Sequence, residues 1–252
     1  MADAGYIAIV VAGFAAYWWR HMRPVWRRQP LPLTPDAEVA VHVAIHEAEA
    51  RHQAMASLHI LYGLLQDDAV TAAIRSAGAD PDALEDRVLS QLGQAPLPAP
   101  DPDNPDDGHW LVARAIARRH DRPVGCADLW ALLGEFPVAK LLDAAALDRG
   151  AVLFILFHGG PAPELPAAAD HRDVFVVLRN DHFTTQELVC HVLRDVFALS
   201  DTQAQATMLA AHTSGRAVIG RFSAAAARAK IDQARALARP HAFPLWIGTE
   251  PA

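Results

Sequence analysis

Cysteine is scarce in this chain, which holds only 2 among its 252 residues. Cys126 and Cys190 lie in different predicted domains and in apolar helical patterns, which favours buried free thiols in a reducing compartment over a disulfide. Basic residues are also in the minority, since 22 Lys and Arg face 29 Asp and Glu and give a formal net charge of -7. A nucleic-acid binder needs a basic face that releases counterions, so the composition disfavours that class.

The motifs of several enzyme classes are missing. No Gly-x-x-x-x-Gly-Lys-Ser/Thr occurs, which excludes the phosphate-binding loop of an ATPase, and no Gly-x-Ser-x-Gly occurs either. His42 and His46 have the spacing of two metal ligands on a helix, but position 50, where a zinc-protease motif needs its second His, is alanine. We therefore predict a chain that is not an enzyme and has no metal and no cofactor. A metallopeptidase, the alternative, would need further ligands.

Long apolar runs are absent except at the N-terminus, where residues 5–19 form an uncharged run of 15. A helix of that length reaches about 22 Å, and the hydrocarbon core measures about 30 Å. Adding residues 2–4 and letting Arg20 reach the interface brings it close to spanning. Aromatic and then basic residues follow, which predicts a transmembrane or anchor helix over residues 1–23 in the bacterial inner membrane, single-pass, with the C-terminal domains in the cytoplasm. A cleaved signal peptide and a helix packed on its own domain are the alternatives.

Small residues line one face of this predicted helix. Ala4, Ala8, Ala12 and Ala16 recur at helical spacing, so a homodimer through the N-terminal helix is a further expectation. Prolines at positions 30, 32 and 35 make residues 24–35 a semi-rigid tether.

Residues 36–155 contain an internal repeat of helical pattern with a fixed offset of 68 positions. Arg51-His52 returns as Arg119-His120, Leu64-Leu65 returns as Leu132-Leu133, and Asp80 returns as Asp148. Coincidences at one offset and at matching helical positions indicate two copies of a four-helix unit, residues 36–93 and 108–155. A segment rich in proline and aspartate separates the copies.

Residues 156–169 are rich in Gly and Pro and form the predicted linker to a second domain, residues 170–252. There the pattern predicts the order βααβαβ, a compact α+β domain. Its first strand, 174–178, runs into Asn180-Asp181, and Thr184 with Glu187 form a predicted capping box of the next helix. A carboxylate beside an amide oxygen in such a rigid turn is suited to binding a cationic amine.

Two resemblances follow from these segments. The double repeat resembles the Clp N-terminal domain, the docking module of Clp unfoldases, through Ser57-Leu-His59-Ile-Leu-Tyr-Gly-Leu-Leu65. The C-terminal domain resembles the ClpS-type adaptor family, in matching order and spacing. The motifs that carry this second resemblance are Asn180-Asp181-x-Phe-Thr184, Met208-Leu-Ala-Ala-His212-x-x-Gly215, Ala217-x-x-Gly220 and Pro244-Leu245.

The ClpS resemblance implies recognition of N-degrons, which are proteins with a free α-amino group and a bulky hydrophobic first residue. It places the α-amino group at Asn180, Asp181 and His212. It places the first side chain in a pocket lined by Thr184, Gln186, Val189, Met208, Ala211 and Leu245. Gln186 stands where the family has a gating Met, Ala211 where it has a larger aliphatic residue, and His182 where it commonly has a second Asp. Lys230 matches a residue that contacts the partner unfoldase, whereas an acidic partner position is Ala225.

We therefore predict an adaptor that delivers N-degron proteins to a Clp-family ATPase for proteolysis. Its fold is multidomain, an all-α double four-helix repeat followed by a ClpS-like α+β domain. The alternative is a membrane-tethered interaction scaffold or a Clp regulator without N-degron binding. Whether the repeat unit binds the ClpS-like domain of the same chain is left open by the sequence.

Overall fold

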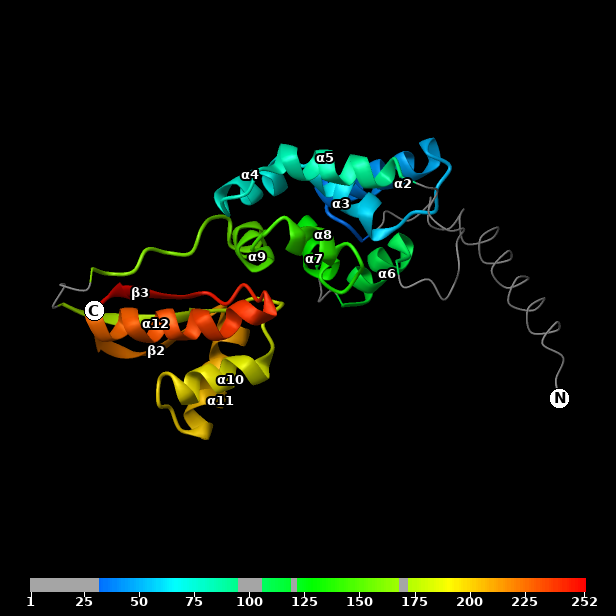
Figure 1. Ribbon diagram of the computed structural model, residues 1–252. Coiled ribbons are helices and arrows are strands. Elements are labelled where there is room, and N and C mark those ends of the chain that lie inside the picture. The colour runs from blue at the N-terminus through cyan, green and yellow to red at the C-terminus, as the bar shows by residue number, and fades with distance from the viewer. Residues whose placement is uncertain (1–31, 95–105, 119–121, 168–171) are drawn as a thin grey trace, which may run out of the picture.

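The computed structural model describes residues 32–94, 106–118, 122–167 and 172–252. These residues form two units, each with its own hydrophobic core. The helical unit takes the described residues from 32 to 158, and the C-terminal unit takes residues 172–252. Figure 1 shows the helical unit on one side of the molecule and the three-stranded sheet with its helices on the other.

Two sets of four helices make up the helical unit. The first set is α2 (Pro35–Ala50), α3 (Ser57–Leu65), α4 (Asp68–Ser76) and α5 (Pro81–Leu92). The second set is α6 (Gly108–Arg118), α7 (Cys126–Leu133), α8 (Ala139–Ala144) and α9 (Arg149–His158).

Equivalent helices of the two sets begin in equivalent ways. α9 starts at Arg149, which is 68 positions after Pro81 at the start of α5, and an aspartate caps both helices. Asp80 accepts a hydrogen bond from the Asp82 amide, and Asp148 accepts one from the Ala151 amide. Leucines of both sets, such as Leu61 and Leu129, lie fully buried in one shared core. The predicted all-α double four-helix repeat is confirmed.

A buried histidine caps α3. The His59 side chain is fully buried, and its Nδ1 accepts a hydrogen bond from the Ala56 amide at 3.1 Å. Its Nε2 lies 3.1 Å from Oε1 of Gln53, so that the neutral ring with a proton on Nε2 satisfies both contacts. Burial lowers the pKa of His59 to about 4. His59 is therefore a structural cap and stays neutral near pH 7.

The C-terminal unit follows the predicted order βααβαβ. Its elements are β1 (Asp173–Arg179), α10 (Gln186–Asp195), α11 (Asp201–Ser214), β2 (Arg216–Ser223), α12 (Ala224–Ala238), a 3-10 turn (Arg239–His241) and β3 (Ile247–Pro251). The sheet has the order β2-β1-β3, and both pairings are antiparallel. The predicted α+β fold is confirmed.

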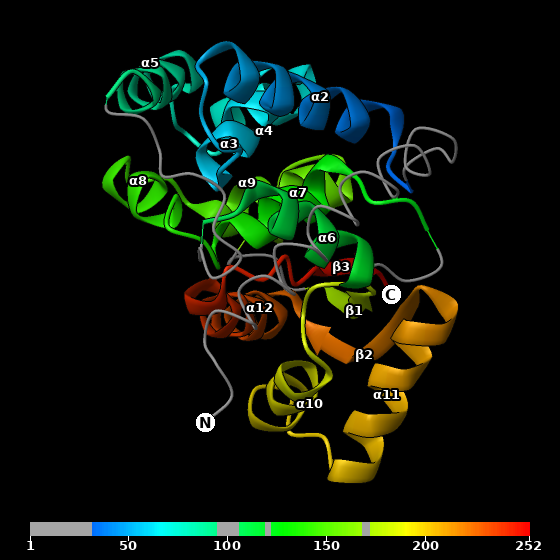
Figure 2. The same cartoon turned by 90° about the vertical axis from the view of Figure 1, so that its right-hand side faces the viewer.

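α9 of the helical unit lies against the sheet of the C-terminal unit, as the two views of Figures 1 and 2 agree. Phe154 of α9 forms a small buried cluster with Val177 of β1 and Trp246, which precedes β3. The sheet of the C-terminal unit thus lies between that unit's own helices and α9.

The predicted placement as a single-pass inner-membrane protein is wrong. Across the residues that the structure describes, no helix is long and apolar enough to cross a bilayer. The predicted anchor (1–23), the alanine face proposed for a homodimer and most of the tether (24–35) lie outside those residues, so neither anchoring nor pairing gains support.

Candidate functional site

A cavity of about 300 Å³ opens where β1 ends, between the 180–185 turn and helices α10 and α11. All nine residues predicted for the α-amine site and the side-chain pocket line it. They are Asn180, Asp181, Thr184, Gln186, Val189, Met208, Ala211, His212 and Leu245. Residues that span 66 positions of the sequence therefore meet around one space, as the resemblance implies.

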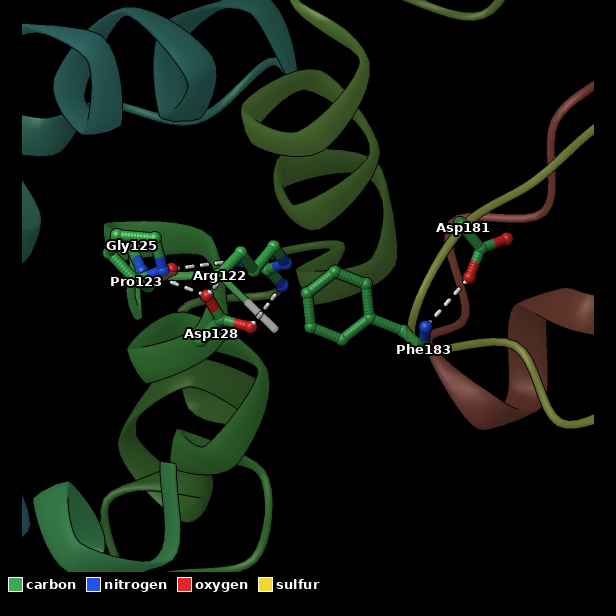
Figure 3. A network of polar contacts seen from close by, with 6 residues as sticks. All are labelled: Arg122, Pro123, Gly125, Asp128, Asp181 and Phe183. Carbon is green, nitrogen blue, oxygen red and sulfur yellow. Dashed lines mark hydrogen bonds and ion pairs between the residues drawn. The ribbon is translucent and has the colours of Figure 1, made fainter. Parts of the chain in front are cut away.

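The Asp181 carboxylate is fixed by its own turn. Its Oδ1 accepts a hydrogen bond from the Phe183 amide at 2.8 Å (Figure 3). Oδ1 also accepts the Thr184 amide at 2.6 Å, and Oδ2 accepts the Thr184 hydroxyl at 2.8 Å. A carboxylate offers about four acceptor sites, so these contacts leave about one on Oδ2. The turn therefore orients Asp181 and leaves it able to accept one more donor.

The start of α10 differs from the prediction. Its N-cap is Thr185, whose hydroxyl accepts from the Leu188 amide at 3.3 Å, and the helix begins at Gln186. The predicted capping box of Thr184 and Glu187 is wrong, because the Thr184 hydroxyl is engaged with Asp181. Thr184 thus supports the carboxylate and the neighbouring threonine supports the helix.

Asn180 and His212 are brought to the same mouth by a backbone contact. The Asn180 amide donates to the carbonyl of Gly215 at 2.9 Å. Gly215 ends α11 with a left-handed φ of 78°, a conformation that glycine adopts without strain. His212, one turn earlier on α11, is exposed, and Asn180 and Asp181 are half-buried. The polar groups therefore sit at the rim of the cavity.

Apolar side chains line the inner part. Ala211 of α11 and Leu245 are buried, each with 3% of its surface exposed, and Val189 and Met208 are half-buried. Gln186 is exposed at the first turn of α10. An apolar interior with a few polar groups at its mouth is typical of a site for a small ligand group.

Six further residues line the cavity: Leu178, Arg179, His182, Phe183, Thr185 and Glu187. The sequence analysis had placed His182 at the site and had not assigned the other five to it. Glu187 adds a second carboxylate, which the sequence had suggested only as a cap. The Arg179 guanidinium stacks on the Trp246 ring at 4.1 Å, an interaction for which the sequence gives no local signal.

Lys230, the predicted partner contact, lies away from the cavity and ties two helices together. Its Nζ donates to the carbonyl of Val196 at the end of α10 and lies 5.8 Å from the ring centres of Phe197 and Phe222. A role of Lys230 in partner binding stays a prediction. Within the fold, Lys230 links α12 to the end of α10.

Replacing Lys230 with methionine should lower the free energy of unfolding by about 1 kcal/mol, because the carbonyl of Val196, the C-cap of α10, loses its donor while the aliphatic stem stays. Urea unfolding followed by circular dichroism measures the change. Lys140→Met is the matched control, since Lys140 is exposed and should shift stability by less than about 0.5 kcal/mol. Equal effects of both substitutions would show that the carbonyl contact contributes nothing.

The metallopeptidase alternative gains no support. Among the described residues, no group of three or more His, Cys, Asp and Glu side chains is placed to hold a metal ion.

Cys126 and Cys190 are both free thiols, and burial raises the pKa of Cys126 to about 12.

Comparison with known proteins adds the family. A family model described as ATP-dependent Clp protease adaptor protein ClpS matches residues 169–248, and a model of the Clp repeat (R) N-terminal domain matches residues 32–107. The ClpS adapter protein of Hydrogenovibrio crunogenus is 41% identical over 75 residues, which are 30% of this chain and 72% of that protein. The chain belongs to the ClpS family. Its predicted composition, a ClpS-type domain joined to a Clp N-terminal repeat, is confirmed.

Other ClpS relatives show the same extent of similarity. The ClpS of Methylococcus capsulatus is 42% identical over 77 residues, 31% of this chain and 73% of that protein. The ClpS of Roseobacter denitrificans is 46% identical over 75 residues, 30% of this chain and 66% of that protein. Among solved structures, Agrobacterium tumefaciens ClpS2 bound to L-phenylalaninamide is 34% identical and covers 32% of this chain and 98% of its own, with a TM-score of 0.31. ClpS proteins are described as adaptors of a protease, and the prediction of a Clp protease adaptor is confirmed.

Proposed function

We propose that this chain captures proteins through a free α-amino group and a bulky hydrophobic first residue, and that it delivers them to a Clp-family ATPase. One observation carries the proposal: a polar rim of Asn180, Asp181 and His212 stands over an apolar cavity of about 300 Å³. On this proposal the chain has no catalytic activity of its own, and the Clp ATPase does the chemical work.

The rim matches the chemistry of an α-ammonium group. This group is largely cationic near neutral pH and has three N–H donors. Asp181 offers the negative charge and about one open acceptor site on Oδ2, and a charge-assisted hydrogen bond there is stronger than a neutral one. The Asn180 amide oxygen and a neutral His212 nitrogen supply the other two acceptors.

The interior matches a large apolar side chain. Met208 and Ala211 face it from α11, and Val189 faces it from α10, with Leu245 also in the lining. Burying a side chain of the size of Leu or Phe is worth about 1.5 to 3 kcal/mol. The small Ala211 leaves room for an aromatic ring, and the exposed Gln186 places an amide at the edge.

Peptides that differ only in their first residue test the proposal with the full chain. By fluorescence anisotropy, peptides starting with Phe, Leu, Trp or Tyr should bind at least about tenfold more tightly than those starting with Gly or Glu. Met208→Ala should weaken binding of the first group. Leu209→Ala on the same helix is the control, since Leu209 is 56% exposed and does not line the cavity.

Equal affinity for all first residues would contradict the proposal. The chain would then act as an interaction scaffold or a Clp regulator that does not bind N-degrons, and its Clp-type repeat would be its working surface.

A further inference from the structure

The turn that holds Asp181 also touches the helical unit. The Phe183 ring packs on the core of that unit, and it meets Phe157 of α9 edge-on with 5.4 Å between ring centres. His182 meets the same Phe157 ring at 5.5 Å. Figure 3 shows the Phe183 side chain pointing away from Asp181 towards Arg122 and Asp128 of the helical unit. The turn is therefore held between the cavity on one side and the helical unit on the other.

Two further contacts join α9 to the segment that ends in Leu245, one of the cavity-lining residues. Nε2 of His158 lies 2.9 Å from the carbonyl oxygen of Pro244, so the neutral ring donates a hydrogen bond next to Leu245. Burial lowers the pKa of His158, which keeps the ring in this neutral form. At the other end of α9, a Cβ at Gly150 would lie 3.0 Å from the Cα of Ala242. Only a glycine permits this close approach without a shift of the backbone.

The residues of the C-terminal unit that make these contacts lie close along the chain to Asp181 or Leu245, which line the cavity. The Phe183 amide is itself a donor to Oδ1 of Asp181, so whatever fixes the Phe183 ring also fixes the peptide that orients the carboxylate. Thr184, which donates its amide and its hydroxyl to Asp181, follows directly. Restricting the turn before the ligand arrives reduces the ordering cost of binding.

We propose that α9 braces the amine site in cis, with Phe157 and Phe183 as positioning residues for Asp181. This inference rests on the proposed function, since it assigns to the Clp-type repeat a part in the capture of the amine. The second copy of the repeat is then a component of the N-degron site. Movement of α9 away from the C-terminal unit lowers the affinity for the α-amino group.

Substitution of Phe157 in the full chain tests the brace. Phe157→Ala should weaken binding of a peptide with a free N-terminal Phe by about fivefold, because an unbraced turn has more freedom to lose on binding. Binding of the acetylated peptide should stay unchanged. The Phe183 and Thr184 amides should exchange hydrogen faster, and Phe157→Leu should restore much of both properties. Trp110→Ala, at an aromatic residue of the same unit that is 57% exposed, should change neither.

A substitution that adds a bulky side chain between α9 and the C-terminal unit tests the same proposal without removing an aromatic side chain. Gly150→Leu inserts atoms against the Ala242 backbone and should weaken free-amine binding to a similar degree. Gly93→Leu is its control, because Gly93 is exposed and a Cβ there meets only ordinary contacts.

The outcomes distinguish a failure of the proposed brace from a failure of the proposed function. The unmodified chain should prefer bulky first residues. If it does, but the Phe157→Ala and Gly150→Leu variants have the same peptide affinities and amide hydrogen-exchange rates as the unmodified chain, the brace is wrong and the proposed function stands. If the unmodified chain shows no such preference, the proposed function itself is wrong.

Discussion

Asp181→Asn should lower the affinity for a peptide with a free α-amino group by about 30-fold, since hydrogen bonds to charged groups contribute about 1.5 to 3 kcal/mol. Asparagine keeps one oxygen that can accept the Phe183 and Thr184 amides, so the turn persists while the charge is lost. Alanine at this position should abolish binding, because it removes the charge and the three contacts that shape the turn. Isothermal titration of the full chain measures both losses.

Glu187→Gln is the matched control for the charge. Glu187 lines the same cavity and is exposed, so its removal tests general electrostatic attraction. We expect a change of about twofold or less at 0.15 M salt, because exposed charges are strongly screened. If Asp181→Asn and Glu187→Gln weaken binding equally, a diffuse acidic field and not an amine clasp attracts the ligand.

Acid should destabilise the helical unit through His59. In the folded state the pKa of His59 is about 4, below the 6.5 of an unburied histidine, so the unfolded chain binds the proton more tightly. Stability is therefore lost as the pH falls from about 6.5 to about 4, and a difference of this size corresponds to about 3 kcal/mol. Protonation also makes Nδ1 a donor, which breaks its contact with the Ala56 amide.

His59→Gln isolates this effect. Glutamine at the third position of a helix can still accept the N-cap amide but does not titrate. Urea unfolding between pH 7 and pH 4 should show that the unmodified chain loses about 3 kcal/mol more than His59→Gln. His42→Gln, at an exposed position, should follow the unmodified chain. Parallel pH profiles for all three chains would contradict a neutral buried His59.

Local patterns predicted much of this fold. The 68-residue offset identified the double repeat, because each copy carries the same caps, such as Asp80 and Asp148. The pattern of residues 170–252 predicted the element order of the C-terminal unit. The residues of the candidate site came from the spacing of a family pattern, and the cavity gathers all nine of them.

Long-range contacts explain what the sequence did not predict. Thr184 and Thr185 are adjacent candidates for the same cap, and only the fold shows that Asp181 engages the first. Phe183 looked like one more apolar residue of the motif, yet its partner Phe157 lies 26 positions away on another unit. The predicted membrane placement was wrong, since no helix of the described residues is long and apolar enough to cross a bilayer, and residues 1–23, on which it rested, lie outside them.

Acetylation of a single peptide tests the central claim most directly. Isothermal titration with the full chain should give a dissociation constant at least about 30 times lower for a peptide with a free N-terminal Phe than for the acetylated form of the same peptide. The reason is that acetylation removes the positive charge and two N–H donors. Equal dissociation constants for the two forms would contradict a site in which Asn180, Asp181 and His212 bind an α-amino group.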